Sequence, residues 1–134
     1  MRYLLDTHAW IWAVLGHRRL SVAARRALAA VEREPVGLAA ISLKEAAWLL
    51  ARGRVIVTKP GVSWSSWLRQ AATATGLEIL PLTVEIAIES EKFPREFPSD
   101  PADRLIAATA SVYDLTLVTA DAVLRGQQGL RTLW

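Results

Sequence analysis

Short apolar runs alternate with longer segments of helical periodicity along the whole chain. Four runs, each three to six residues long, are predicted strands: residues 2–5, 36–41, 78–82 and 116–118. Residues 130–133 are a candidate fifth strand at the sheet edge, and residues 55–57 fit either a small strand or an extended connector. Short, wholly apolar strands separated by helices are typical of a parallel sheet covered on both faces. The pattern therefore predicts an α/β fold, a three-layer α/β/α sandwich with a mostly parallel sheet of four to five strands.

The longer segments repeat their apolar positions at helical spacing and have recognisable ends. Predicted helices cover residues 7–15, 21–33, 42–51, 63–75, 83–92 and 101–113. Gly16 and Gly76 end two of them, because glycine readily adopts the left-handed conformation that follows a helix. Ser21 is the expected cap of the second helix and Pro35 its stop. Residues 93–98 contain two prolines and are a predicted loop.

The composition is that of a folded domain. The chain has 134 residues, of which 52% are hydrophobic and 22% charged, and no repeat or linker divides it, so we expect a single domain over residues 1–134. Cysteine is absent, which excludes disulfides and thiolate metal sites and suits a reducing cytoplasm. The apolar run at the N-terminus is too short for a signal peptide or a membrane span. We therefore expect a cytoplasmic protein that does not enter the membrane.

The basic residues are mostly arginine. Net charge is +3, and arginine supplies thirteen of the sixteen basic side chains. Its planar fork suits phosphate oxygens. Five arginines crowd into residues 18–33: Arg18, Arg19, Arg25, Arg26 and Arg33. This cluster fits a solvated helix face, with Glu32 and Glu34 beside it, as well as it fits a surface for nucleic acid or an acidic protein.

Four acidic residues occupy related places beside the predicted strands. Asp6 ends the first strand and Asp121 follows the fourth. Glu45 lies in the helix after the second strand, and Asp103 lies in the helix before the fourth. Ligands of parallel α/β sheets bind beyond the carboxyl ends of the strands, near the point where the strand order reverses. We therefore expect these four side chains to converge at one rim.

Helix capping is the alternative explanation for most of these acids. Ser42 and Glu45 match a capping box. Asp100 can cap the helix that begins at residue 101, with Asp103 in its first turn, and Asp121 can open a turn or a short helix. Capping and chemistry remain compatible, because a carboxylate at a helix start also lies beside the strand ends.

Asp6 is the acid that capping explains least well. It stands between an apolar strand and an apolar helix, where a charge is costly unless it is paired, metal-bound or at the sheet rim. Four carboxylates within a few ångström would raise each other's pKa, and a divalent cation would relieve that repulsion. Oxygen ligands without cysteine favour magnesium or manganese over zinc. The implied chemistry is hydrolysis at phosphorus by a metal-activated water.

Four segments together resemble a known family. They are Leu-Leu-Asp-Thr-His-Ala at residues 4–9, residues 42–45, Asp-Pro-Ala-Asp-Arg-Leu-Ile-Ala-Ala at residues 100–108, and Leu-Val-Thr-Ala-Asp at residues 117–121. In this order and spacing they resemble the PIN-domain ribonucleases. More narrowly, they resemble the VapC toxins of type II toxin–antitoxin pairs. The likeness spans nearly the whole chain.

The resemblance implies a magnesium-dependent endoribonuclease, with manganese as an alternative ion. It implies metal ligands at Asp6, Glu45, Asp103 and Asp121. It also implies an RNA substrate, a cognate antitoxin that blocks the site, and a homodimer. Supporting roles around the ligands fall to Thr7, Asp100, Arg104 and Thr119.

Within this supporting set, Thr119 matches the hydroxyl residue that supports the metal-bound waters in this family. Asp100 is expected to cap its helix. For Arg104 we expect a structural pairing with a neighbouring aspartate, rather than a contact with phosphate.

Two other classes of protein are compatible with acids at strand ends. A noncatalytic binding module would keep the acids for capping and sequester RNA or a protein without cutting it. A receiver-type signalling domain would need adjacent acids after the first strand and a lysine near the last. Here Thr7 follows Asp6, and no lysine lies beyond Lys92, so the receiver class is disfavoured.

Two groups of side chains remain without a definite role. His8 could contact a metal-bound water or an RNA phosphate, although a partly buried histidine bonded to backbone is the expectation. Most tryptophans are expected to pack in the core, with base stacking as the alternative. There are six: Trp10, Trp12, Trp48, Trp64, Trp67 and Trp134.

Overall fold

The computed structural model describes residues 1–31, 33–57 and 59–134, and within these ranges it contains a five-stranded sheet. Its strands are β1 (Tyr3–Leu5), β2 (Val36–Ala39), β3 (Leu77–Leu80), β4 (Thr116–Val118) and β5 (Thr132–Leu133). The spatial order is β3-β2-β1-β4-β5, and every neighbouring pair is parallel. The predicted parallel sheet is confirmed, with the fifth strand at its edge.

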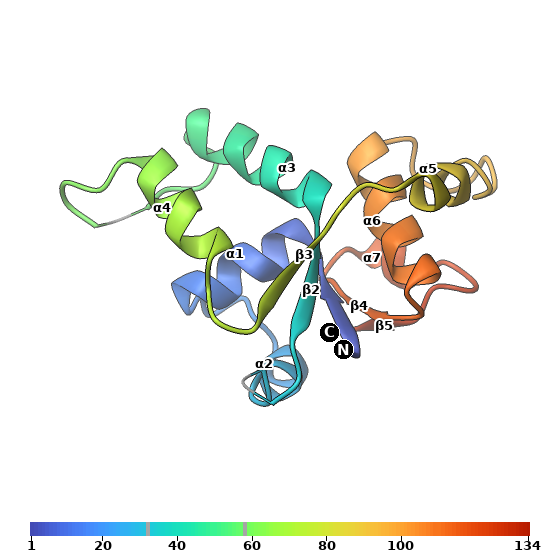
Figure 1. The fold of residues 1–134 in the computed structure, drawn as a ribbon, viewed down its shortest axis with the longest axis horizontal. Helices are drawn as coiled ribbons and strands as arrows, with labels where there is room; N and C mark the ends of the chain where they lie inside the picture. The colour runs from blue at the N-terminus through green and yellow to red at the C-terminus, as the bar shows by residue number, and fades with distance from the viewer. Residues whose placement is uncertain (32, 58) are drawn as a thin grey trace.

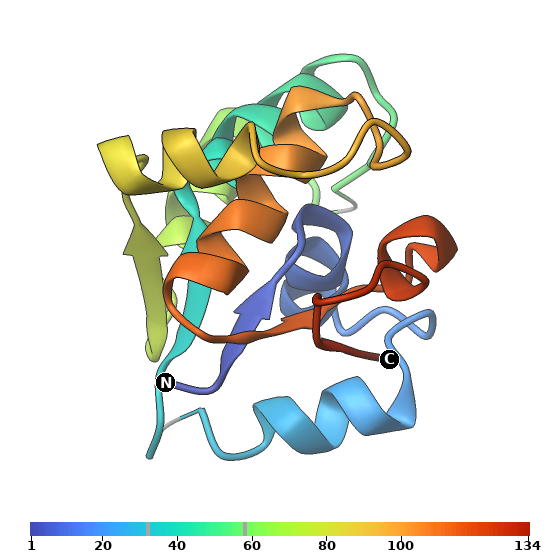
Figure 2. The same cartoon turned by 90° about the vertical axis from the view of Figure 1, so that its right-hand side faces the viewer.

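Helices cover both faces of this sheet (Figure 1). They are α1 (Thr7–Leu15), α2 (Val22–Leu28), α3 (Ala40–Ala51), α4 (Trp64–Ala72), α5 (Val84–Ser90), α6 (Pro101–Val112) and α7 (Ala122–Arg125). Helices α1 to α4 lie on one side and α5 to α7 on the other, with the sheet between them (Figures 1 and 2). The α/β/α sandwich expected from the sequence is therefore present. No helix of the described residues is long and apolar enough to cross a membrane.

Two packed clusters of apolar side chains hold the layers together. Successive residues of a strand point to opposite faces, and Leu4 and Leu5 of β1 are both almost fully buried. Leu5 joins the cluster that packs against α1 to α4, which includes Trp10 and Trp67. Leu4 joins the cluster on the opposite face, which includes Ile106 of α6. Burial on both faces therefore fixes the central strand β1, and with it the position of Asp6, the residue that follows.

Several predicted boundaries were wrong by a few residues. The strand expected over residues 36–41 ends at Ala39, because α3 begins directly at Ala40. The helix expected to reach Arg33 ends at Leu28, and turns then lead the chain back to β2. Glu32 lies outside the described residues. The ambiguous residues 55–57 form a connector, not a strand.

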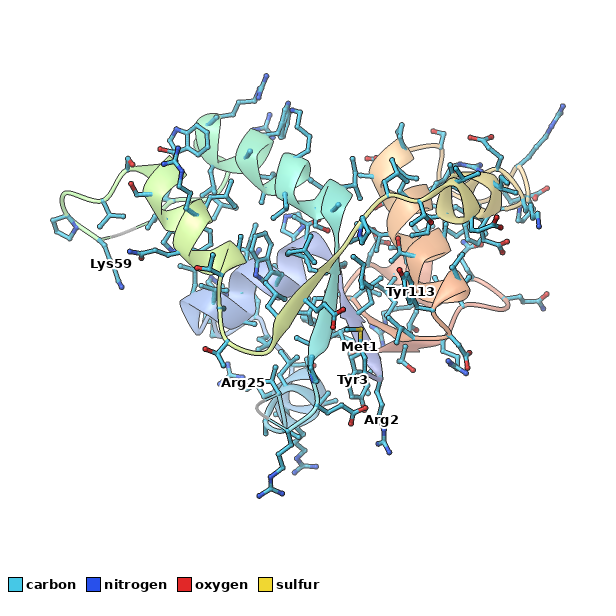
Figure 3. The ribbon with its side chains drawn as sticks, in the orientation of Figure 1. Met1, Arg2, Tyr3, Arg25, Lys59 and Tyr113 are labelled. Carbon is cyan, nitrogen blue, oxygen red and sulfur yellow. The ribbon has the colours of Figure 1, made fainter. Side chains whose placement is uncertain are left out.

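Glu34 and Arg25, two charged side chains in the first part of the chain, have structural partners. Glu34 pairs with the amino group of Met1 at 3.2 Å and with Arg2 at 3.8 Å. Figure 3 shows Met1 and Arg2 at the amino end of β1. Arg25 donates hydrogen bonds to the backbone carbonyls of Leu20 and His17 at 3.1 and 3.2 Å. Glu34 therefore forms ion pairs with the N-terminal residues, and Arg25 helps to hold the segment before α2 in place.

The turn before β3 requires glycine. Gly76 has a φ of +81°, and a Cβ there would lie 2.7 Å from the backbone oxygen of Val31. Gly76→Ala is expected to lower the free energy of unfolding by about 3 kcal/mol, since left-handed strain and the clash add. Gly53→Ala is the matched control, because Gly53 has a φ of +66° but open space around it. It should lower the free energy by about 1 kcal/mol. Equal urea-unfolding curves for the two variants would contradict this account.

Candidate active site

The strand order reverses at the centre of the sheet. From β1 the chain builds β2 and β3 on one side, and it then returns to build β4 and β5 on the other. The carboxyl ends of β1 and β4 therefore meet at the switch point where α/β sheets bind ligands. Asp6 follows β1 directly, and its backbone N–H donates to the carbonyl of Val118, the last residue of β4, at 3.1 Å.

A hydrogen-bond network fixes the carboxylate of Asp6. As the cap of α1, its Oδ1 accepts from the backbone N–H of Ala9 at 2.8 Å. Its Oδ2 accepts a hydrogen bond from the hydroxyl of Thr119. That hydroxyl in turn accepts from the backbone N–H of Asp121 at 3.0 Å. Thr119, which is fully buried, thereby joins Asp6 to the segment that carries Asp121.

All four acids expected from the sequence line one cleft of about 480 Å³. Asp6 follows β1 and Asp121 lies three residues after β4, whereas Glu45 and Asp103 lie within α3 and α6, so the acids come from four separate parts of the chain. Asp100 lines the same cleft. The remaining lining residues are Thr7, His8, Trp12, Arg19, Ile106 and Ala120. The cleft thus brings together side chains that lie up to 115 positions apart in the sequence, from Asp6 to Asp121.

Two of the expected helix caps are present. Asp100 caps α6, where its Oδ1 accepts from the backbone N–H of Ala102 at 2.8 Å, and Asp103 lies in the first turn. Asp121 caps α7, where its Oδ1 accepts from the N–H groups of Val123 and Leu124 at 2.8 and 3.2 Å. Asp121 therefore has a structural role in addition to lining the cleft.

The capping box expected at Ser42 and Glu45 was wrong. Helix α3 begins at Ala40, and its cap, Ala39, makes no side-chain hydrogen bond. Ser42 is fully buried inside the helix, and its Oγ accepts from the hydroxyl of Thr7 at 3.0 Å. The reason is that β2 runs straight into α3, so both residues lie further into the helix than the sequence motif suggests. Glu45 has no capping role, and its side chain lines the cleft.

The acids of the cleft form no ion pairs within the part of the chain that the structure describes. In the described ranges, no lysine, arginine or histidine forms an ion pair with Asp6, Glu45, Asp103 or Asp121. Burial raises the pKa of Asp6 above its ordinary value, against the hydrogen bonds from Thr119 and Ala9. Burial and then the charges of Asp100, Asp121, Glu45 and Asp6 raise the pKa of Asp103 to about 6. The charge of His8 lowers the pKa of Asp6, but no ion pair in the described residues neutralises the four acids of the site.

The donor set suits a hard divalent cation. All four acids offer oxygen, and magnesium and manganese prefer oxygen ligands. Among the described residues, no three histidine or acidic side chains converge closely enough to hold one ion directly. Water would therefore complete the coordination sphere, which is the arrangement that magnesium prefers.

Two expectations for neighbouring side chains were wrong. Arg104 pairs with no aspartate in the described residues and instead donates to the carbonyls of Ser90 and Phe97, both at 3.3 Å. It ties α6 to the end of α5 and to the loop between the two helices. His8 is exposed, not partly buried, and its ring lies 5.6 Å from that of Trp12. Helix α1 turns His8 outward, so that it lines the cleft.

Comparison with known proteins assigns the class. The PIN domain family model matches residues 3–128, and the chain therefore belongs to the PIN-domain family. It is 37% identical over 133 residues to Ribonuclease VapC22 of Mycobacterium tuberculosis, which covers 98% of this chain and 97% of that protein. The resemblance to VapC toxins is thereby confirmed.

Solved structures of low sequence identity share the fold. VapBC2 from Rickettsia felis, bound to a DNA fragment from its promoter, matches with a TM-score of 0.73 at 19% identity, over 99% of this chain and 98% of that one. FitAcB from Neisseria gonorrhoeae matches with a TM-score of 0.68 at 22% identity, over 98% and 96%. These matches confirm the PIN-like architecture.

Proposed function

We propose that this protein is a magnesium-dependent endoribonuclease that acts in the cytoplasm as the toxin of a type II toxin–antitoxin pair. The observation that carries the proposal is the cleft at the switch point, where four acids meet that form no ion pair within the described residues. The 37% identity to a VapC ribonuclease supports RNA as the substrate.

Asp6, Glu45, Asp103 and Asp121 would hold the ion, either directly or through water. When bound, a divalent ion lowers the pKa of the attacking water and neutralises the leaving oxygen. Thr119 keeps Asp6 in place through its hydroxyl, and the backbone N–H of Ala9 fixes the second carboxylate oxygen. These hydrogen bonds therefore orient the carboxylate of Asp6 before any ion binds.

A cleavage assay with purified protein tests this function. Wild-type protein should cut RNA internally with magnesium or manganese and should lose this activity in chelator. The alternative, a noncatalytic PIN-like module that sequesters RNA or a protein, predicts binding without cut products under all of these conditions. The absence of cleavage at saturating metal would reject the nuclease.

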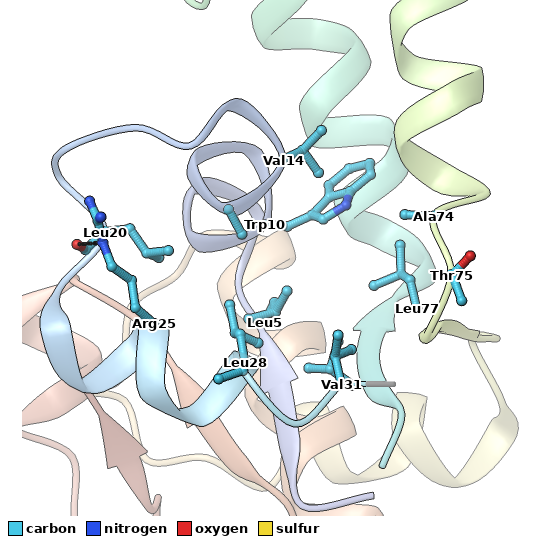
Figure 4. A pocket seen from close by; sticks show the side chains of 13 residues that line it. Leu5, Trp10, Val14, Leu20, Arg25, Leu28, Val31, Ala74, Thr75 and Leu77 are labelled. Carbon is cyan, nitrogen blue, oxygen red and sulfur yellow. Dashed lines mark hydrogen bonds between the residues drawn. The ribbon is translucent and has the colours of Figure 1, made fainter. Parts of the chain in front are cut away.

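For the antitoxin we propose a second surface. An apolar groove of about 510 Å³ lies between α1, α2 and the segment that precedes β3. Figure 4 shows Leu5, Leu28, Val31 and Leu77 around this space, with Val14 at its rim. One solved structure with this fold is a toxin–antitoxin complex from Klebsiella pneumoniae, which supports an antitoxin segment as the occupant. The homodimer remains a prediction that sedimentation would test.

Val14→Glu should weaken antitoxin binding at least tenfold and leave RNA cleavage unchanged, because it places a charge on apolar surface that binding would bury. Val14 is 40% exposed and lines the groove, so the folded toxin should tolerate the change. Val22→Glu is the matched control, since Val22 is 66% exposed on α2 and does not line the groove. Calorimetry with the purified antitoxin measures both. Equal affinity in the two variants would place the antitoxin elsewhere.

A further inference from the structure

One wall of the acidic cleft is aromatic and basic. His8, Trp12 and Arg19 line it beside the four acids. None of the three caps a helix, and none is among the four acids expected to hold the ion. Their side chains combine a π-surface with a cation, which is the combination that single-stranded nucleic acid recognises.

The aromatic part of this wall is held rigidly. His8 and Trp12 stand one turn apart on α1, with ring centroids 5.6 Å apart and an interplanar angle of 56°. The ring of Trp12 also neighbours those of His17 and Trp134, with ring centroids 6.0 and 5.7 Å away. Contacts from the following loop and from the C-terminus thus fix the indole, while His8 remains exposed to the cleft.

The basic part of the wall is Arg19. Its guanidinium lies 5.9 Å from the centre of the Trp12 ring, and its backbone N–H donates to Nδ1 of His17 at 3.0 Å. Although five acids line the same cleft, the guanidinium forms no ion pair with any of them in the described part of the chain. Its forked donors therefore remain available for an anion that enters the cleft.

We propose that His8, Trp12 and Arg19 form a nucleotide-binding subsite of the cleft. The base next to the scissile phosphate stacks against the His8–Trp12 pair, and Arg19 binds the adjoining phosphate. A base inside a duplex cannot present its face to this wall, so the subsite selects unpaired RNA. This inference rests on the proposed ribonuclease function, because it concerns how that substrate is held.

Replacement of His8 separates stacking from other roles. Stacking a base on an aromatic ring is worth enough that losing the ring weakens binding roughly tenfold. His8→Ala should therefore raise KM for a short single-stranded RNA about tenfold and change kcat less than threefold. His8→Phe should restore KM, because phenylalanine keeps the ring and loses the nitrogens. A failure of His8→Phe to restore KM would show that the nitrogens act, which would overturn the stacking role.

Arg19→Gln tests the phosphate contact. It should raise KM and reduce the salt dependence of binding, because one phosphate contact is lost. Arg18→Gln is the matched control, since the neighbouring Arg18 is also exposed and does not line the cleft. Trp48→Leu is the control for aromatic surface in general. Trp48 is 38% exposed and does not line the cleft. The guanidinium of Arg52 lies 4.7 Å from the centre of its ring.

The results distinguish this inference from the proposed function. Wild-type protein that fails to cut RNA rejects the nuclease, whatever the variants do. Wild-type protein that cuts, together with unchanged KM in His8→Ala and Arg19→Gln, rejects the subsite alone. Equal losses in the control variants would also reject it, because binding would then be spread over the surface. Preference for the unpaired over the duplex form of one RNA, lost in His8→Ala, is the supporting result.

Discussion

Asp103→Asn is expected to abolish RNA cleavage and at the same time to stabilise the metal-free protein. The pKa of Asp103 is raised to about 6 from 3.8, first by burial and then by the charges of Asp100, Asp121, Glu45 and Asp6. A carboxyl group with a raised pKa binds its proton more tightly in the folded state. Its ionisation therefore costs stability as the pH rises from about 4 to about 6. Asparagine carries no charge and avoids this cost.

The expected gain is about 1–2 kcal/mol in the free energy of unfolding at pH 7.5, after allowing for solvent screening of a partly exposed group. Urea unfolding in chelator measures it. The difference between variant and wild type should vanish near pH 4, where both side chains are neutral. Magnesium should reverse the order, because it stabilises only the wild type. A variant that is less stable than wild type at pH 7.5 without metal would contradict this account of the cleft.

Asp6→Asn should reduce cleavage more than a hundredfold while the domain stays folded. The loss follows because the amide carries no negative charge for a divalent ion, and removal of a single catalytic interaction commonly costs at least that factor. The fold should persist, because asparagine is also a good helix cap and can still accept from the N–H of Ala9. Single-turnover cleavage and a thermal melt, measured together, check both parts.

Asp114→Asn is the matched control for Asp6→Asn. Asp114 makes its ion pair with Arg131 at 2.7 Å, away from the cleft lining, and its φ of +55° suits asparagine. The same chemical change there should leave cleavage within twofold of wild type. If Asp6→Asn retained wild-type cleavage, Asp6 would have no part in the reaction.

The sequence predicted the layers of the fold well because local signals agreed with the tertiary structure. The apolar run of residues 116–118 is a strand with the expected bounds, and helix α1 ends at Gly16 as expected. The helix expected up to Arg33 ends early, since the chain must turn there to pack Val31 against Gly76. That contact joins residues far apart in the sequence, and local periodicity does not contain it.

The acids that line the cleft could be found from their places relative to the strands, and Thr119 from the family resemblance, but other side-chain partners could not. Ser42 matched a local capping motif, whereas its actual partner is Thr7, 35 positions away. The sequence raised an RNA contact for His8 and base stacking for the tryptophans, but it did not predict that His8, Trp12 and Arg19 line the same cleft. Arg19 belonged to a run of arginines with no signal to distinguish it, and only the folded loop brings it over Trp12. Tertiary packing decides which side chains meet in and around the cleft, and the local sequence does not contain that information.

Titration of the purified protein with manganese in a calorimeter tests the central claim most directly. We expect stoichiometric binding by wild-type protein and by Asp114→Asn, and the loss of that binding in Asp6→Asn and Asp103→Asn. Wild-type protein that binds no ion, or an Asp6→Asn variant that binds as wild type does, would show that this cleft is not a metal site.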